Sequence, residues 1–181
     1  GVRLVNATTG GPGEVQPGGE WFVPPRTPLA AAWDHLAQAL GRICDAADQC
    51  GVDIVLEPCV GALVHDYYSL QALFRRVDHA RLCVTLAPSP FVLYRNDVAY
   101  AIRRLGEKIK HVHVKDAAGN PGVFGLDFLF PALGAGAMDW PVFFQGLDDI
   151  GYRGALSAEY EQFKYMRDVL GDDYGEAARR T

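Results

Sequence analysis

The sequence predicts an α/β fold with parallel strands, because apolar strand-like runs alternate along it with amphipathic helical stretches. The strand-like runs begin at residues 2, 53, 82, 110 and 155, which leaves room for a helical crossover between each pair. Five such units can form a small doubly wound sheet or five eighths of a (β/α)8 barrel, which takes about 250 residues when complete. The pattern leaves both architectures open. In either case the 181 residues, 49% of them hydrophobic, are expected to form one domain.

The first two strands and the helix between them follow from apolar runs and the residues that end them. Residues 2–7 (VRLVNA) are expected to form a short strand, followed by a Gly/Pro-rich loop over residues 8–28. From Leu29 onward, apolar residues recur every three or four positions, which indicates one face of a helix. Gly51 is placed to end that helix, and residues 53–57 (DIVLE) then form the second strand.

The remaining units repeat this order of helix and strand, and a residue that can act as N-cap precedes each expected helix. The expected caps and helices are Ser69 for residues 70–77, Asn96 or Asp97 for residues 98–105, and Asp139 for residues 140–150. Each of these helices is followed by a strand, and the three strands are expected at residues 82–87, 110–115 and 155–159. The rest of the chain is expected to be helical and polar.

Composition and charge exclude several classes of protein. Seventeen basic and 22 acidic residues give a net charge of −5, which argues against binding to a nucleic-acid backbone. No apolar run approaches the ~18 residues of a membrane span and no signal peptide is evident, so a cytoplasmic protein is expected. The cysteines form no C-x-x-C pair and are expected to be buried, reduced thiols; they are Cys44, Cys50, Cys59 and Cys83.

Polar residues at the ends of the predicted strands are the candidate functional residues. His111, His113 and Lys115 share one face of their strand, which is unusual where a buried parallel strand should be apolar. Glu57 and Glu159 each stand at the carboxyl end of a strand, the edge where parallel α/β folds place their active sites. Together, Glu57, His113 and Glu159 form a candidate divalent-metal cluster. The alternative is that the histidines are packed core residues and the glutamates are solvated strand ends.

Four stretches of the sequence carry a resemblance to a known family. They are AA…GVDIVLEP at residues 46–58, RND…AIRRLGEKIKHVHVKD at 95–116, GAG…MDW at 134–140 and GYRGALSAEYE at 151–161. As a set, covering roughly residues 29–162, they resemble the sugar phosphate isomerase/epimerase family of the xylose-isomerase-like barrel superfamily.

The resemblance implies a partial xylose-isomerase-like (β/α)8 TIM barrel that occupies residues 1–181 as one domain. It aligns residue 2 with about the fourth strand of the barrel, so the first three βα units are expected to be missing. The chain is then the C-terminal part of a longer protein, which the absence of an initiator Met favours. The alternatives are that a different chain completes the barrel or that copies of this chain do so as a homo-oligomer.

The resemblance also implies a metal site. Glu57, His113 and Glu159 match three of the family's four ligands to a divalent metal such as Mn²⁺, Mg²⁺ or Zn²⁺. The fourth ligand is usually an Asp in a run such as Asp-Pro-Ser-His. This chain has Ala87 in place of that Asp and Pro90 in place of the His, with the Pro-Ser pair retained between them.

The missing carboxylate bears directly on metal affinity. Mn²⁺ and Mg²⁺ prefer about six ligands, so its loss is expected to weaken binding and open a position to water. Asp66 and Glu161 are the carboxylates that could replace it, although neither sits on the motif. The site is therefore expected to be impaired, with little turnover from these residues alone.

The function expected from the resemblance is metal-assisted proton abstraction next to a carbonyl, on a small sugar or sugar acid. Glu57 and Glu159 would be the acid/base pair, and Lys115 and His111 would contact substrate. A sugar-acid or inosose-type dehydratase uses the same proton abstraction, and a non-catalytic barrel used for binding or assembly also fits Ala87. An abasic-site nuclease would need a histidine near residues 124–131, where the chain has none.

Overall fold

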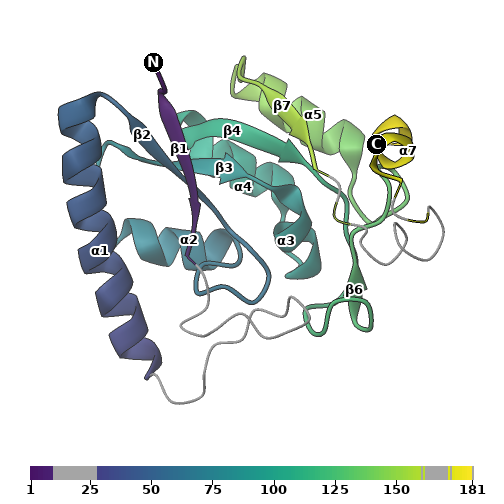
Figure 1. The fold of residues 1–181 in the computed structure, drawn as a ribbon, viewed down its shortest axis with the longest axis horizontal. Coiled ribbons are helices and arrows are strands. Elements are labelled where there is room, and N and C mark those ends of the chain that lie inside the picture. Colours follow the sequence, from purple (N-terminus) through teal and green to yellow (C-terminus); the bar gives the residue numbers. More distant parts are fainter. Residues whose placement is uncertain (10–27, 160, 162–170, 172, 181) are drawn as a thin grey trace.

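The computed structural model describes residues 1–9, 28–159, 161, 171 and 173–180, and its main feature is a curved five-stranded sheet (Figure 1). The strands are β1 (Leu4–Thr8), β2 (Asp53–Glu57), β3 (Leu82–Leu86), β4 (Ile109–Val114) and β7 (Leu156–Ala158). Neighbouring strands are all parallel, in the order β1-β2-β3-β4-β7. A doubly wound sheet reverses its strand order, whereas here the order in the sheet follows the order in the chain. The partial barrel is therefore confirmed.

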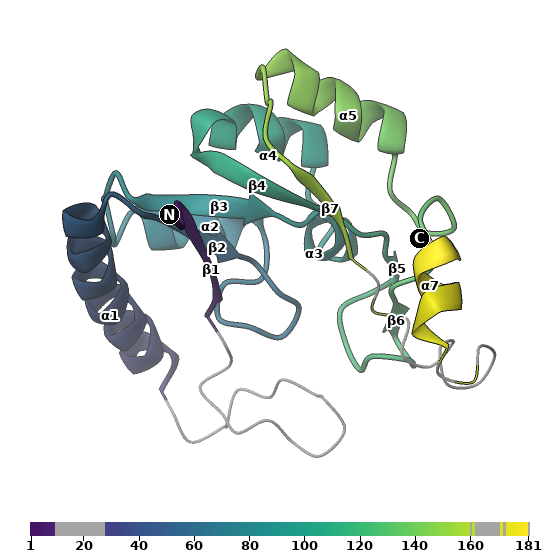
Figure 2. The same ribbon diagram turned by 45° about the horizontal axis from the view of Figure 1, so that its top comes forward.

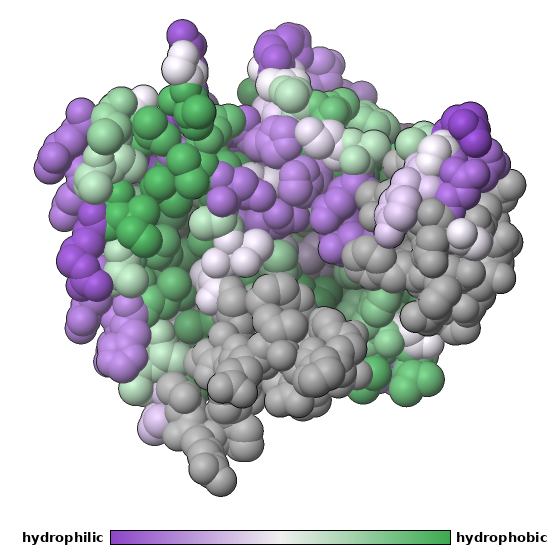
Figure 3. All heavy atoms as spheres, viewed as in Figure 1, coloured by the Kyte–Doolittle hydropathy of each residue, from purple (hydrophilic) through white to green (hydrophobic). Residues whose placement is uncertain are grey.

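Helices cover the convex face of the sheet, as Figure 2 shows from a second angle. The helices that pack there are α1 (Leu29–Cys50), α2 (Tyr67–Phe74), α3 (Pro88–Leu93), α4 (Val98–Leu105) and α5 (Trp140–Asp149). Alternate strand residues such as Leu56, Leu86 and Val112 point toward them and are fully buried. The concave face is open in the described part of the chain. Figure 3 looks onto it and shows polar side chains gathered between β1 and β7.

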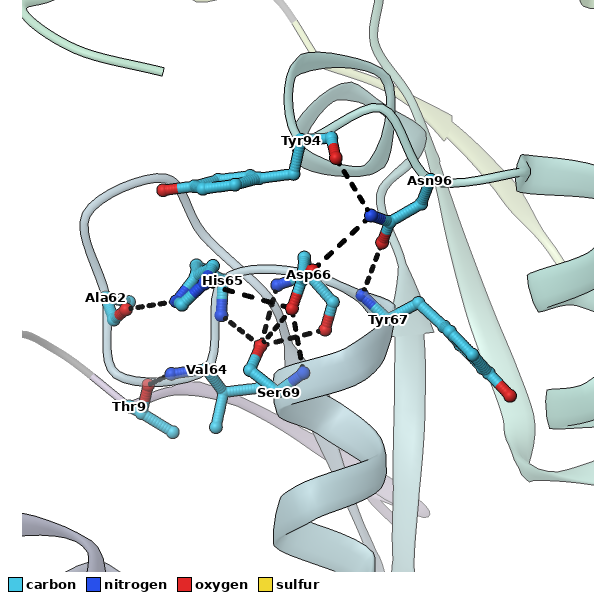
Figure 4. A network of polar contacts seen from close by, with 9 residues as sticks. All are labelled: Thr9, Ala62, Val64, His65, Asp66, Tyr67, Ser69, Tyr94 and Asn96. Atoms are coloured by element: carbon cyan, nitrogen blue, oxygen red, sulfur yellow. Dashed lines mark hydrogen bonds and ion pairs between the residues drawn. The ribbon is translucent and has the colours of Figure 1, made fainter. Parts of the chain in front are cut away.

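Capping side chains set the ends of the helices, with one correction to the prediction. The expected cap Ser69 is the third residue of α2, which begins three residues earlier than predicted with Asp66 as its N-cap. Asp66 accepts a hydrogen bond from the Ser69 N–H at 2.8 Å, and the Ser69 hydroxyl accepts one from the Asp66 N–H at 2.9 Å (Figure 4). Both residue types form caps, so the sequence did not rank them. Asp97 and Asp139 cap α4 and α5, and Gly51 ends α1 with φ of 66°.

Asn96, the alternative cap for α4, has a different role. Its side-chain oxygen accepts a hydrogen bond from the Tyr67 N–H at 2.8 Å, and its side-chain nitrogen donates to Asp66 at 3.4 Å. It therefore joins the start of α2 to the segment that precedes α4.

Four elements were not predicted. They are α3, the 3-10 helix η1 (Gly106–Lys108) and the two strands of a short hairpin, β5 (Ala118–Gly119) and β6 (Phe128–Leu129). Helix α3 begins at Pro88 and contains Pro90. Two prolines within six residues are more typical of a loop, so the sequence did not indicate a helix there. The hairpin strands have two residues each, too few for any periodicity to show. The hairpin packs through Phe128 against Leu93 and Ala117.

Two segments of the sequence prediction lie partly outside the described residues: the Gly/Pro-rich loop and the polar C-terminal segment. This applies to residues 10–27 of the first loop and to most of residues 160–172. Near the C-terminus, the expected helical structure is present as α7 (Tyr174–Arg180). No helix in the described ranges combines the length and apolarity needed to cross a bilayer.

All four cysteines are free thiols. Cys44 and Cys83 are buried, and burial raises the pKa of both thiols. Cys59 is half-buried, whereas Cys50 is exposed because it ends α1 on the solvent side. The expectation of buried thiols was therefore wrong for Cys50.

Candidate metal centre

Three strands bring Glu57, His113 and Glu159 to the same edge of the sheet. Glu57 is the last residue of β2, and His113 is the last but one of β4. Glu159 directly follows β7, and its N–H donates to the Val114 carbonyl at 3.1 Å, so its backbone is fixed to the end of β4. Because the strands are parallel, all three side chains reach the carboxyl-end rim of the half-barrel.

The three side chains converge closely. The distance from His113 Nδ1 is 2.8 Å to Glu57 Oε1 and 3.1 Å to Glu159 Oε2. One potential ligand atom from each residue lies within 4.8 Å of the other two. Glu57 is only 6% exposed, so its carboxylate is shielded from bulk water, whereas His113 and Glu159 are half-buried. Two carboxylates and an imidazole at this spacing can hold a divalent metal ion.

The members of the cluster shift one another's pKa values. Close contacts with the carboxylates of Glu159 and Glu57 raise the pKa of His113 to about 9, although burial opposes the change. Burial tends to raise the pKa of Glu159, but its contacts with His113 and Lys115 outweigh burial and lower it. An imidazolium between two carboxylates is therefore stable at neutral pH.

One oxygen of the cluster is left without a hydrogen bond. Glu159 Oε2 is fully buried, and the His113 ring nitrogen nearest to it already bonds Glu57. The oxygen lies 3.1 Å from the His113 ring but accepts no hydrogen bond, and a buried carboxylate oxygen in this state favours a cation as its partner. The donor set and this oxygen both fit a divalent metal ion.

A chain of hydrogen bonds from two neighbouring strands holds Glu57 in place. Asn6 of β1 donates to Glu57 Oε2 at 3.1 Å, and the Thr85 hydroxyl of β3 donates to Asn6 at 2.8 Å. The sequence analysis did not identify either residue. The signal was present, since each is a polar residue within an apolar strand. Cys59 lies beside the Glu57 backbone, and burial raises its pKa to about 12, so its thiol is not a nucleophile.

Lys115 lies between the cluster and a further carboxylate. Its Nζ is 3.1 Å from Glu159 Oε1 and 2.6 Å from Glu161 Oε2, and 4.5 Å from the centre of the Phe130 ring. Burial opposes the charge on Lys115, but Glu161 and Glu159 outweigh it and raise the pKa. The side chain is 7% exposed, so its charge is directed at these neighbours.

The segment that follows Lys115 is fixed by Asp116, which is 1% exposed. Its carboxylate accepts five hydrogen bonds, from the N–H groups of Ala117, Gly134, Gly136 and Met138 and from the Trp140 ring. A side chain at Gly136 would collide with this carboxylate. One buried aspartate therefore ties the whole connection between β4 and α5 to the rim.

The other residues singled out from the sequence lie near the cluster but outside it. His111 is half-buried one layer below, with its ring edge-on to His113 at 5.1 Å, and burial lowers its pKa. Ala87 is 1% exposed at the end of β3. Asp66 is engaged in the cap of α2, and Glu161 contacts Lys115. Neither carboxylate is among the clustered ligand atoms.

A parallel half-barrel with a carboxylate–histidine cluster at the carboxyl ends of its strands defines a class of protein, the TIM barrels that act through their strand ends. The chain belongs to the family described as xylose isomerase-like TIM barrel, which matches residues 1–180.

Curated relatives cover part of the chain at low identity. Inosose dehydratase of Geobacillus thermodenitrificans is 26% identical over 141 residues, 72% of this chain and 47% of its own length. Fructoselysine 3-epimerase of Escherichia coli is 26% identical over 145 residues, 74% of this chain and 47% of its own length. The chain thus spans about half the length of the curated relatives it matches.

Solved structures share the fold. The IolI protein with a bound zinc atom has a TM-score of 0.71 at 18% identity, covering 99% of this chain and 61% of that one. An L-ribulose 3-epimerase has a TM-score of 0.66 at 22% identity, covering 90% of this chain and 49% of that one. At these identities the likeness shows the fold alone.

Proposed function

We propose that this chain carries the metal-binding half of a sugar isomerase or epimerase site. The observation that supports the proposal is the cluster of buried Glu57 with half-buried His113 and Glu159, in which one carboxylate oxygen accepts no hydrogen bond. These three residues would hold a divalent metal, of which Mn²⁺, Mg²⁺ and Zn²⁺ are the candidates. The metal, when bound, would polarise substrate oxygens next to the carbon that loses its proton.

The residues of the chain would do the rest of the chemistry. One of the two glutamates would take the proton from the carbon beside the carbonyl, and the other would return it. The burial of Glu57 would strengthen its interaction with the reacting carbon, because a low local dielectric screens charge less than water does. Burial keeps His111 largely neutral, which suits a hydrogen bond to a substrate hydroxyl. Asn6 would fix the orientation of Glu57 from the neighbouring strand.

A dehydratase is the second candidate, favoured by the match to inosose dehydratases. It begins with the same proton abstraction, after which a hydroxyl leaves as water. A non-catalytic binding role is the third, because Ala87 removes a ligand. A barrel-completing chain or second copy and a cytoplasmic location stay predictions.

Calorimetric titration with Mn²⁺ and Zn²⁺ tests the metal site. We expect Glu57→Gln and His113→Ala each to weaken binding by at least about tenfold, because each removes one of three ligands. Glu107→Gln, which changes an exposed carboxylate far from the rim, is the matched control and should bind as the wild type does. Wild-type affinity in Glu57→Gln would refute the site.

Proton abstraction is tested separately, by NMR of L-ribulose or an inosose incubated with the metal-loaded protein in D₂O. Deuterium at the carbon beside the carbonyl, lost in Glu57→Gln, would support the enzyme. A new unsaturated product would identify the dehydratase. Metal binding without exchange on the complete protein would favour the non-catalytic role.

A further inference from the structure

Glu161 is a third carboxylate near the cluster, and its partner is Lys115. Its Oε2 and the Oε1 of Glu159 contact the same nitrogen, Lys115 Nζ, at 2.6 Å and 3.1 Å. One ammonium group thus holds two carboxylates side by side. Only Glu159 also reaches His113, through its other oxygen. Glu161 and Glu159 are thus joined through one nitrogen, which places the Glu161 carboxylate next to a cluster residue.

Lys115 has no evident capacity for another partner among the described residues. An ammonium group has three donors. Two directions are taken by Glu159 and Glu161, and the face of the Phe130 ring lies 4.5 Å from the nitrogen. At 7% exposure, the side chain meets little solvent from which a substrate group could approach.

We infer that Lys115 sets the number of carboxylates that the metal site offers. It holds Glu161 and one oxygen of Glu159, so that the cluster keeps three ligands and open positions for the oxygens of a hydroxy-ketone substrate. This inference rests on the proposed function. It gives Lys115 a positioning role in place of the direct substrate contact expected from the sequence.

The reason is the competition between two cations for the same oxygens. Affinity for a divalent ion rises with the number of charged ligands around it. A carboxylate released from Lys115 beside a dication would be drawn to it and would fill a position that substrate needs. Lys115 thus lowers the affinity of the site for the metal but leaves coordination positions free for substrate.

Co²⁺ is a suitable probe, because calorimetry gives its affinity and its visible absorption falls as coordination number rises. We expect Lys115→Met to bind Co²⁺ roughly tenfold more tightly, with weaker absorption, because Glu161 joins the site. Lys115→Arg, which keeps the charge, should resemble the wild type. Lys110→Met, which removes an exposed charge from the same strand, is the control.

A double-mutant cycle separates a gained ligand from lost repulsion. Glu161→Gln should change Co²⁺ affinity by about twofold or less in the wild type, but by roughly tenfold in the Lys115→Met background. If tighter binding persists when both substitutions are combined, lost repulsion alone explains it and the inference is wrong. Thermal unfolding of the metal-free variants checks that they fold, and Lys115→Gln replaces Lys115→Met if the latter does not.

The outcomes for the two proposals are distinct. Wild-type binding with no change in Lys115→Met would leave the proposed metal site standing and overturn the role of Lys115. A wild type that binds no Co²⁺, with a gain in Lys115→Met that depends on Glu161, would overturn the proposed function and the open substrate positions, and would support only the control of ligand number by Lys115.

Discussion

Ala87 is the residue whose replacement tells most about the metal site. It lies two residues beyond Thr85, at the end of the strand between those that carry Glu57 and His113. Its methyl group is 1% exposed, so the position is occupied by apolar packing where the related family has a carboxylate. Restoring that carboxylate tests both the ligand set and the space around it.

Ala87→Asp should raise Mn²⁺ affinity by roughly tenfold, because it adds a fourth charged ligand. Without metal the same variant should be less stable by about 1–3 kcal/mol, since a carboxylate is buried beside two others. Calorimetry and thermal unfolding with and without Mn²⁺ measure both effects. Ala87→Asn, of similar size but neutral, should gain much less affinity. Equal gains in the two variants would show that charge is not the cause.

The sequence predicted the clustered residues better than those that support them. Glu57, His113 and Glu159 could be found because each stands at a strand end, and the ends of parallel strands share one edge. Asn6 and Thr85 could not be linked to Glu57, because their contact depends on which strands are neighbours and in what register. The roles of all five residues in binding or catalysis stay predictions.

At the scale of elements, the connection from β4 to α5 depends on one aspartate. Asp116→Ala should lower the free energy of unfolding by roughly 3–5 kcal/mol, because several buried N–H groups lose their acceptor at once. Asp127→Ala is the control, since this exposed carboxylate accepts one such bond, from Val123, and should cost about 1 kcal/mol. Urea unfolding of the metal-free proteins gives both values. Similar losses would mean that Asp116 is not the centre of the connection.

Elements with a clear period were predicted, and those without one were not. Strands and long helices came within a few residues of their observed bounds, since apolar spacing identifies them. The start of α2 was misplaced because Asp66 and Ser69 are both cap formers and bond each other. Helix α3 and the β5–β6 hairpin are defined by tertiary contacts, which no local pattern contains.

At the scale of the whole molecule, the described sheet has two unpaired edges. β1 and β7 each pair with one neighbour, and apolar side chains there, such as Val5 and Leu156, are exposed. Hydrogen exchange should therefore be fastest in these two strands and slowest in β3, which is paired on both sides and fully buried. Exchange measured by mass spectrometry at several protein concentrations tests this. Protection of β1 and β7 that rises with concentration would instead indicate that a second copy covers the edges.

The order in which the cluster residues occur along the chain has a consequence for folding. Glu57 and His113 lie on β2 and β4, which precede β7 in the chain, whereas Glu159 follows β7, a three-residue strand that pairs with β4 alone in the described sheet. A metal held by all three residues could bind fully only after β7 has paired with β4. The appearance of a metal signal during refolding would then time the final assembly step, and a chelator would loosen the C-terminal strand before any other.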